Sequence, residues 1–428
     1  MSELNNNVLR KLFIGLDNKV KIFNNKEVIP INFDNAATTP VFTSVLDKIK
    51  ESCETYGAIG RGLGQKSIYS TQVYYECKNY VLDFFNAPKD KYTTIFINNT
   101  TEGINRLSNI LIKNKTDIVI TTRMEHHSND LPWRNKCTLK YVEVDELGRL
   151  KLDELKYLLE KYNGLVKYVS LTAASNVTGY INDLLYISEI VHKYNAKLIV
   201  DGAQIVAHKA IDFSLLNIDY LVFSAHKMYA PFGSGAIIGP IKDFEEFNSD
   251  FTGGGTVDFV FDNTEILLSP PEKDEAGSPN FFGAVALVES MKEIKKISFS
   301  SIEANEKQLF DYTIKGLSSI KNIIIYGDIE KTSDRLGIIV FNIKDMYHTN
   351  CARALADLSG ISVRQGAFCA HPYVRRLLKI SDYDAIINSK LPNYKVPGMV
   401  RVSFGIYNSI SEVDTFLNTL EFICKLNI

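Results

Sequence analysis

Lys227 is the strongest candidate in this sequence for a residue that does chemistry. It follows the apolar run Tyr220–Phe223, which predicts a buried strand, and it precedes a glycine-containing turn at 231–235. A lysine at a strand end can form a Schiff base with an aldehyde, and pyridoxal phosphate is the usual such aldehyde. Ser224 and His226 would then bind its phosphate. The alternative is a solvated loop lysine.

Asp201 is the natural partner of that lysine. It ends the apolar run Lys197–Val200, the predicted strand that comes before the strand of Lys227. A carboxylate there can pair with a pyridine nitrogen and keep it protonated, which makes the ring an electron sink. The alternative is an aspartate that caps the next turn. Together the two residues predict one site at which they converge.

Two further segments can bind such a ligand. Thr100 and Thr101 follow the predicted strand 94–98 and open a helix, where hydroxyls and backbone N–H groups form an anion cradle or a plain helix cap. His126 follows the predicted strand 117–121, and its imidazole can lie over a planar ring or move protons. The adjacent His127 would point the opposite way on a strand, so we predict no metal site.

Three residues elsewhere complete the candidate set. Asn176 follows the predicted strand 166–171 and can bind a phenolic oxygen, or it is a turn residue. Arg401 lies in an alternating apolar strand, where a buried charge needs either a substrate carboxylate or an internal salt bridge. Cys369 lies in a loop near Arg364, where a thiol can act as a nucleophile, although most free cysteines are buried and inert.

The elements that position these residues alternate between strand and helix. Helical patterns at 103–114, 151–162 and 184–194 separate several of the strands, which predicts a mostly parallel sheet covered on both faces. Chemistry in such sheets collects at the carboxyl ends of the strands, where the candidate residues lie. We predict a large domain at 26–291 and a smaller α/β domain formed by 292–428 and completed by 1–25, which includes a helical pattern at 8–16.

Composition narrows the class of protein. The chain has 428 residues and a net charge of -2, which excludes a broad basic surface for nucleic acid. No apolar run approaches the ~20 residues needed to cross a bilayer, and the polar start has no hydrophobic signal region. Six cysteines occur without a CxxC pair, which fits neither a disulfide framework nor a zinc site. We expect a cytoplasmic protein with reduced thiols.

The motifs, taken in order, resemble the class V aminotransferase superfamily, and within it the SUF-type cysteine desulfurase and selenocysteine lyase group. The resemblance runs from Asn32 to Asn408 and includes the blocks TTEGIN, MEHHSNDLPW, SNVTG, VDGAQ, SAHK, GGGT, EAGSPN and VRQGAFCAHP. It implies fold type I of the pyridoxal phosphate enzymes: a large domain with a mostly parallel mixed sheet between helices, and a smaller C-terminal α/β domain.

The resemblance also implies a role for each candidate residue. Lys227 carries pyridoxal phosphate and then acts as acid and base, and Cys369 accepts sulfur from the substrate. The remaining cofactor contacts are Asp201 at the pyridine nitrogen, Gln204 and Asn176 near the phenolic oxygen, His126 over the ring, and Thr100, Thr101, Ser224 and His226 at the phosphate. Thr256 and Ser278 would face the cofactor of a partner subunit in a homodimer. Arg401, Arg364 and Asn35 would bind the substrate.

The implied reaction converts L-cysteine to L-alanine and leaves a persulfide on Cys369. A protein that accepts the sulfur, as in iron–sulfur cluster assembly, is an implied partner. Another class V activity, such as an aminotransferase, epimerase or β-lyase without a catalytic Cys369, is the alternative. The chain departs from the group at three places. Ala367-Phe368 precede the thiol where a histidine is usual, Gly60 replaces a histidine, and Ala173-Ala174 replace a His-Val pair.

Overall fold

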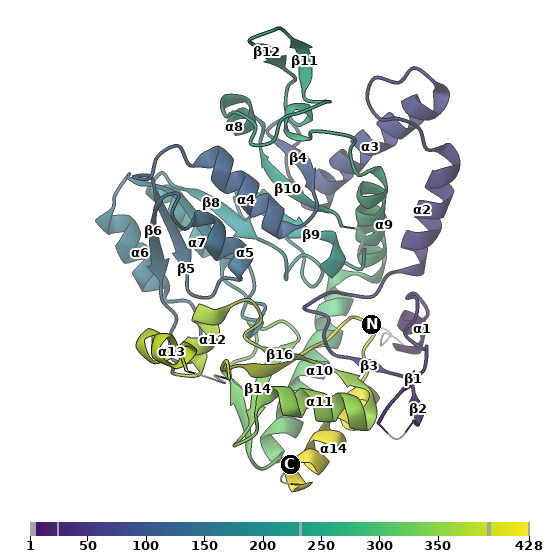
Figure 1. Cartoon of the computed structure of the whole chain (residues 1–428), viewed down its shortest axis with the longest axis vertical. Helices are drawn as coiled ribbons and strands as arrows, with labels where there is room; N and C mark the ends of the chain where they lie inside the picture. The colour runs from purple at the N-terminus through teal and green to yellow at the C-terminus, as the bar shows by residue number, and fades with distance from the viewer. Residues whose placement is uncertain (1–5, 24, 231–232, 392–394, 427–428) are drawn as a thin grey trace.

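The computed structural model describes residues 6–23, 25–230, 233–391 and 395–426. Pro231 and Phe232 of the predicted glycine-containing turn lie outside these ranges. So do residues 1–5, 24, 392–394 and 427–428 of the predicted smaller domain. The described chain forms a large lobe and a smaller lobe, with the C-terminus in the smaller one (Figure 1).

A mixed seven-stranded sheet forms the centre of the large lobe. Its strand order is β4-β10-β9-β8-β7-β5-β6. Strand β10 runs antiparallel to both of its neighbours, and the pairs among β9, β8, β7, β5 and β6 are parallel. The predicted mostly parallel mixed sheet is therefore confirmed. The bounds are β4 (Tyr92–Ile97), β5 (Ile118–Thr122), β6 (Thr138–Val142), β7 (Val166–Thr172), β8 (Lys197–Asp201), β9 (Tyr220–Ser224) and β10 (Gly235–Pro240).

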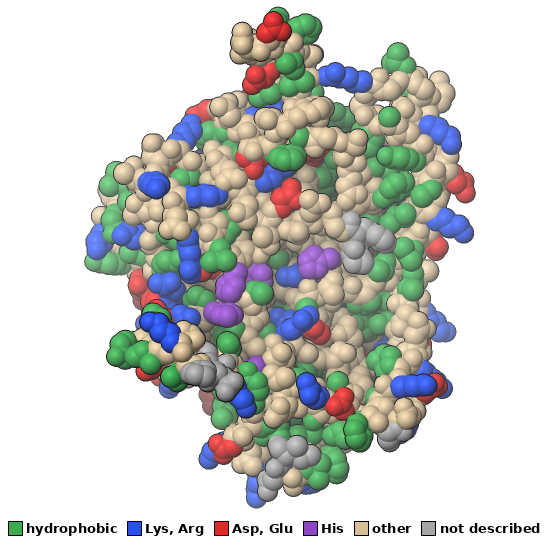
Figure 2. Space-filling view, in the orientation of Figure 1, with side chains coloured by type: hydrophobic (Ala, Val, Ile, Leu, Met, Phe, Trp, Pro, Cys, Tyr) green, Lys and Arg blue, Asp and Glu red, His purple; other side chains and the backbone are tan. Residues whose placement is uncertain are grey.

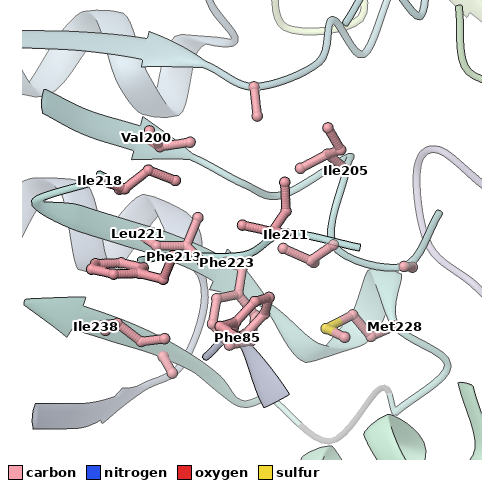
Figure 3. Close-up of a cluster of buried hydrophobic side chains, with 14 of the residues drawn as sticks. Phe85, Val200, Ile205, Ile211, Phe213, Ile218, Leu221, Phe223, Met228 and Ile238 are labelled. Carbon is pink, nitrogen blue, oxygen red and sulfur yellow. The ribbon is translucent and has the colours of Figure 1, made fainter. Parts of the chain in front are cut away.

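Both faces of this sheet are buried, which explains why its strands are continuous apolar runs rather than alternating ones. Along β9, Leu221 and Phe223 enter one hydrophobic cluster, whereas Tyr220 and Val222 enter another on the opposite face. Figure 3 shows the first cluster, in which Met228 just beyond β9 packs with Phe223 and its neighbours. Each fully buried side chain of this size contributes about 1.5–3 kcal/mol. Strand β9, which ends at Ser224 shortly before Lys227, is thus fixed from both sides.

Helices cover the two faces of the sheet (Figure 1). Helix α4 shows how the sequence places one of them. The Asn99 side chain accepts a hydrogen bond from the Glu102 N–H, and the Glu102 carboxylate accepts one from the Asn98 N–H, which together cap the helix. At Gly103 a Cβ atom would collide with Val222 of β9, so only glycine allows this close approach. The bounds are α2 (Thr43–Thr55), α3 (Gln65–Phe84), α4 (Thr100–Leu111), α5 (His127–Asp130), α6 (Leu152–Lys161), α7 (Leu184–Lys193), α8 (Ile241–Glu246) and α9 (Phe281–Ile297).

The smaller lobe contains a four-stranded antiparallel sheet in the order β13-β14-β17-β16. Its register places Arg364 of β16 directly opposite Arg401 of β17. The early strand β3 pairs in parallel with the late strand β15, so the two ends of the chain share this lobe. The bounds are β3 (Ile31–Asn32), β13 (Ile323–Tyr326), β14 (Ile338–Ile343), β15 (Ile361–Ser362), β16 (Arg364–Gly366), β17 (Met399–Ser403), α10 (Phe299–Ser319), α11 (His348–Ser359), α12 (His371–Leu377), α13 (Asp382–Ser389) and α14 (Ile410–Leu426).

The lobes differ from the predicted boundaries in three places. The predicted division between 291 and 292 falls inside the continuous helix α9. Strand β3, which the prediction placed in the large domain, pairs within the smaller lobe. The helix predicted at 8–16 is shorter in the structure, where α1 covers only Asn6–Arg10. The chain turns after α1, and the Arg10 side chain binds Asp17. Within the described residues, no helix has the length and apolar character to cross a bilayer.

Two short hairpins lie apart from the main sheets. Strands β1 (Val20–Lys21) and β2 (Glu27–Val28) form one of them beside the smaller lobe. Strands β11 (Val257–Val260) and β12 (Glu265–Leu267) form the other, which projects from the top of the large lobe (Figure 1). The second hairpin exposes four large apolar side chains, Phe259, Val260, Phe261 and Ile266, each more than half accessible. An exposed apolar ribbon of this kind is typical of a surface that contacts another chain.

Candidate active site

A cavity of about 490 Å³ brings most of the predicted site residues together. The large lobe contributes residues just beyond β4, β5, β7, β8 and β9, and the smaller lobe contributes residues of and beyond β16 and β17. Figure 2 shows histidine side chains gathered near the middle of the displayed face, at the level where the lobes meet. The predicted residues that line the cavity are Thr100, Thr101, His126, Asn176, Asp201, Gln204, Ser224, His226, Lys227, Arg364, Cys369 and Arg401.

Lys227 and Asp201 line this cavity together and interact electrostatically. Burial is the main cause that lowers the pKa of Lys227, to about 8, although the nearby Asp201 charge acts in the opposite direction. A neutral amine is the form that attacks an aldehyde. Burial also raises the pKa of Asp201, whose carboxylate accepts a hydrogen bond of 2.9 Å from the Ala203 N–H. A cation placed beside this carboxylate would restore its charged state.

His126 is held as a neutral ring in one tautomer. Its Nδ1 atom accepts a hydrogen bond of 3.1 Å from the Ser128 N–H, so the ring proton of the neutral form resides on Nε2. Burial first, and the Lys227 charge second, lower the pKa of His126 to about 3. The Ser128 hydroxyl also bonds Nδ1 at 2.9 Å and the Thr101 hydroxyl at 2.6 Å. An uncharged imidazole that is fixed in this way can cover a planar ligand.

The start of α4 and the end of β9 form a polar cradle. The Ser224 hydroxyl bonds both the N–H and the hydroxyl of Thr100 at 2.7 Å. Thr101 adds a second hydroxyl at the same helix terminus, where the helix dipole favours an anion. His226 lies beside this cradle, and burial lowers its pKa to about 4. Hydroxyls, backbone N–H groups and a helix N-terminus are together a suitable donor set for a phosphate.

The two amide side chains predicted near a phenolic oxygen are hydrogen-bonded within the protein. Asn176 donates to the Phe368 carbonyl at 2.8 Å, and Gln204 donates to the Ala36 carbonyl at 2.9 Å. Each NH₂ group has two protons, so each amide can still donate a second hydrogen bond into the cavity. Asn176 therefore joins the cavity wall to the segment that carries Cys369.

Arg401 has the internal salt bridge that the sequence left open as one of two alternatives. Its Nη2 atom binds the Asp34 carboxylate at 3.1 Å, and Nη1 binds the Asn176 carbonyl at 2.8 Å. Arg364 binds the same carboxylate at 2.7 Å. The Nε atom of Arg401 is buried without a hydrogen-bond partner among the described residues. Two guanidinium groups share one carboxylate, so one positive charge and one buried donor remain available for an anionic ligand.

Cys369 is exposed to the cavity on a short turn at 367–370, between β16 and α12. Phe368 and Cys369 both have φ near 52°, in the left-handed region. This conformation costs a residue other than glycine roughly 1–2 kcal/mol. The turn persists because external donors hold it: Asn176 binds the Phe368 carbonyl, and the His127 N–H binds the Cys369 carbonyl at 2.6 Å.

Three predicted site residues lie outside the cavity. Asn35 is buried behind its wall, where its amide donates to the backbone carbonyls of Asn32 and Ser403. Ser278 instead lines a separate surface groove of about 670 Å³. Thr256 is fully buried beside that groove and donates to the Gly253 carbonyl.

Sequence reasoning missed several residues that shape the site. Asp34 is the most important, because it is the counter-ion of both arginines. The signal was present, since a buried arginine requires a partner and Asp34 begins the block that continues into Ala36 and Ala37 of the cavity wall. Glu125, directly before His126, was also missed, and burial raises its pKa to about 8.

The chemistry of the cavity residues fits pyridoxal phosphate. One cavity contains a lysine with a lowered pKa, a buried carboxylate, a neutral imidazole and a hydroxyl-rich helix N-terminus, which are the kinds of group that an aldehyde, a pyridine nitrogen, a ring face and a phosphate each require. A mostly parallel α/β sheet that presents these groups at its carboxyl edge is the architecture of the fold-type-I enzymes that depend on pyridoxal phosphate.

Comparison with known proteins gives the family. The aminotransferase class-V family model matches residues 31–416, and the chain belongs to this family. A probable cysteine desulfurase of Pyrococcus abyssi is 34% identical over 92% of this chain and 94% of its own length. A probable cysteine desulfurase of Borreliella burgdorferi is 32% identical over 97% and 96%. The apo structure of cysteine desulfurase from Thermococcus onnurineus superposes with a TM-score of 0.83 at 31% identity, covering 92% of this chain and 95% of that one.

Proposed function

We propose that this chain is a pyridoxal-phosphate-dependent cysteine desulfurase. It converts L-cysteine to L-alanine and keeps the sulfur on Cys369 as a persulfide for delivery to an acceptor. The observation that carries this proposal is the position of Cys369. Its thiol is exposed in the same cavity as Lys227 and the substrate-binding candidate Arg401. The similarity to proteins named cysteine desulfurase over most of the chain supports the same activity.

Residues of the large lobe would hold the cofactor. Asp201 pairs with the ring nitrogen, His126 covers the ring, and Gln204 and Asn176 offer amide protons to the phenolic oxygen. The phosphate contacts are Thr100, Thr101, Ser224 and His226. Pyridoxal phosphate, when bound, withdraws electrons from the α-carbon of an attached amino acid into its protonated ring.

Residues of the smaller lobe would orient the substrate. The α-carboxylate accepts hydrogen bonds from Arg401, including its Nε atom, and Arg364 adds a second positive charge. Asp34 keeps the two guanidinium groups in place without neutralising both of them. Cys369 lines the same cavity, so the side chain of a substrate bound by these arginines would have access to its thiol.

Lys227 would then move protons. Its Nζ atom would remove the α-proton of the substrate and later return protons to the carbon skeleton. A pKa of about 8, lowered mainly by burial, places this amine near the working pH, where it can act in both directions.

Cys369 would take the sulfur. Its thiolate attacks the substrate sulfur, an S–S bond forms, and the Cβ–S bond breaks with its electron pair going to the carbon skeleton. Protonation of that skeleton gives L-alanine. The balance is one cysteine and one enzyme thiol to one alanine and one enzyme persulfide, so no external oxidant is consumed. A thiol of the acceptor then removes the sulfane sulfur by the same exchange chemistry.

A second copy of the chain would complete the site in a homodimer. This is supported by the exposed hairpin β11–β12 and by the groove that contains Ser278, because a cluster of exposed large apolar side chains is typical of an interface. Thr256 and Ser278 would then face the partner's cofactor. We place the reaction in the cytoplasm, where thiols stay reduced, and expect a sulfur-acceptor protein such as those of iron–sulfur cluster assembly.

The test is a single-turnover reaction of the holoenzyme with L-cysteine, with alanine and protein persulfide both quantified. The wild type is expected to form one alanine and one persulfide per active site. Cys369→Ser and Cys369→Ala should bind cofactor normally and form neither product. Alanine formation by Cys369→Ala at the wild-type rate would instead indicate a different class V activity on this substrate.

A further inference from the structure

His127 has no part in the chemistry proposed above, yet it contacts the Cys369 turn twice. It is the first residue of α5 and lies half-buried beside the turn. Its backbone N–H donates to the Cys369 carbonyl at 2.6 Å. Its ring Nε2 atom accepts a hydrogen bond of 3.3 Å from the backbone N–H of His371. One residue therefore holds the turn on both sides of Ala370.

The turn requires such support because its conformation is unfavourable by itself. Phe368 and Cys369 are consecutive residues other than glycine in the left-handed region. Within the turn, the Ala370 N–H donates to the Ala367 carbonyl at 2.8 Å. The other contacts come from outside, from Asn176 at Phe368 and from His127 at Cys369 and His371. If these contacts were lost, the thiol would sample other directions.

The ring of His127 must be uncharged to accept a hydrogen bond at Nε2, because an imidazolium has only donors. Burial is the main cause that lowers the pKa of His127, and the neighbouring His371 lowers it further. The two rings lie 5.0 Å apart between centroids. The surroundings thus keep the acceptor available at neutral pH. The contact uses the backbone of His371, so the His371 side chain is not needed for it.

We propose that His127 is a positioning residue for Cys369: its ring acceptor and its backbone N–H fix the left-handed turn and thereby aim the thiol into the cavity. This proposal rests on the proposed function, in which Cys369 accepts the sulfur. It assigns the second histidine of the pair a role distinct from that of His126, which faces the cofactor site. The direct contact of His127 is with the turn and not with the substrate.

The test compares holoenzymes carrying His127→Ala, His127→Gln and His371→Ala. Glutamine places an amide oxygen near the position of Nε2 and can accept the same hydrogen bond without a charge. Amide hydrogen exchange of the segment 368–374 measures directly how firmly the hydrogen bonds of His127 hold this segment. Losing one hydrogen bond should speed exchange at the His371 amide roughly 2- to 10-fold in His127→Ala. Exchange should stay close to wild type in His127→Gln, and the His371→Ala control should keep its protection.

Turnover supplies the second measurement. In His127→Ala, kcat for alanine formation should fall by a similar factor with KM for L-cysteine unchanged, because Arg401 still binds the carboxylate. His127→Gln should recover kcat. Three results would each overturn the proposal. The first is unchanged exchange in His127→Ala, and the second is faster exchange in that variant with an unchanged kcat. The third is a His127→Gln variant as slow in turnover as His127→Ala. If Cys369→Ala still makes alanine normally, the proposed function fails, whereas the exchange data still decide whether His127 holds the turn.

Discussion

Replacing Arg401 by lysine should weaken substrate binding far more than it slows chemistry. In the structure Nη1 and Nη2 bind Asn176 and Asp34, whereas the buried Nε atom has no partner among the described residues. Lysine has a single ammonium head in place of the guanidinium group and no donor at the Nε position. A hydrogen bond to a charged group contributes about 1.5–3 kcal/mol, so the KM for L-cysteine should rise roughly 10- to 150-fold.

The assay pairs two ligands with two proteins. L-Cysteine and cysteamine, which lacks the carboxylate, are titrated into wild-type and Arg401→Lys holoenzyme, and the half-saturating concentration is read from the cofactor absorbance. We expect a large loss of affinity for L-cysteine and little change for cysteamine. Equal losses for both ligands would instead show that the arginine acts on the fold of the cavity and not on the carboxylate. Burial lowers the pKa of Arg401 only to about 10, so both assays can be run at pH 8 with the arginine charged.

Three further outcomes follow from the buried groups. The rate at which pyridoxal phosphate loads onto the apoprotein should rise roughly fivefold from pH 7 to pH 8 and level off at higher pH. The reason is that the neutral Lys227 amine is the reactive form and its pKa is about 8. A rate that continues to rise up to pH 10 would contradict this. Gly103→Ala should lower the free energy of unfolding by about 1–3 kcal/mol in urea titration, and Val222→Ala should recover part of it, since the added Cβ meets that side chain. Lys78→Met should lower the free energy of unfolding by about 3–5 kcal/mol in the same measurement, because it leaves Glu275 buried without its ion-pair partner. An unchanged urea midpoint would show that the pair is not isolated from water.

The sequence predicts the large lobe and its reactive edge well, for a physical reason. Buried strands are short apolar runs, and the polar residue that ends each run must lie at the edge of the sheet. Asp201 and Lys227 could therefore be assigned to one site before any contact was known. Periodicity does not give strand direction, however, and the antiparallel β10 was not foreseen.

The smaller lobe was less predictable because its site depends on pairing between distant strands. The alternating apolar pattern around Arg401 predicted a strand with this arginine on one face. It could not predict the strand register that places Arg364 opposite Arg401. The counter-ion Asp34 lies near the other end of the chain. The left-handed turn at Phe368 and Cys369 contradicts the usual preference for glycine, and only the external contacts of Asn176 and His127 account for it.

The pairing of β3 with β15, and the ion pairs of Asp34 with both arginines, have a consequence for biosynthesis. Asp34 leaves the ribosome more than three hundred residues before its two partners, which are 330 and 367 positions away. The nascent chain can assemble the central sheet and present Lys227 while the carboxylate-binding half of the site does not yet exist. Closing so long a loop comes late and is intrinsically slow. A chain truncated just before β17 would therefore resemble the complete protein at its cofactor end and yet lack Arg401, the residue proposed to bind the substrate carboxylate.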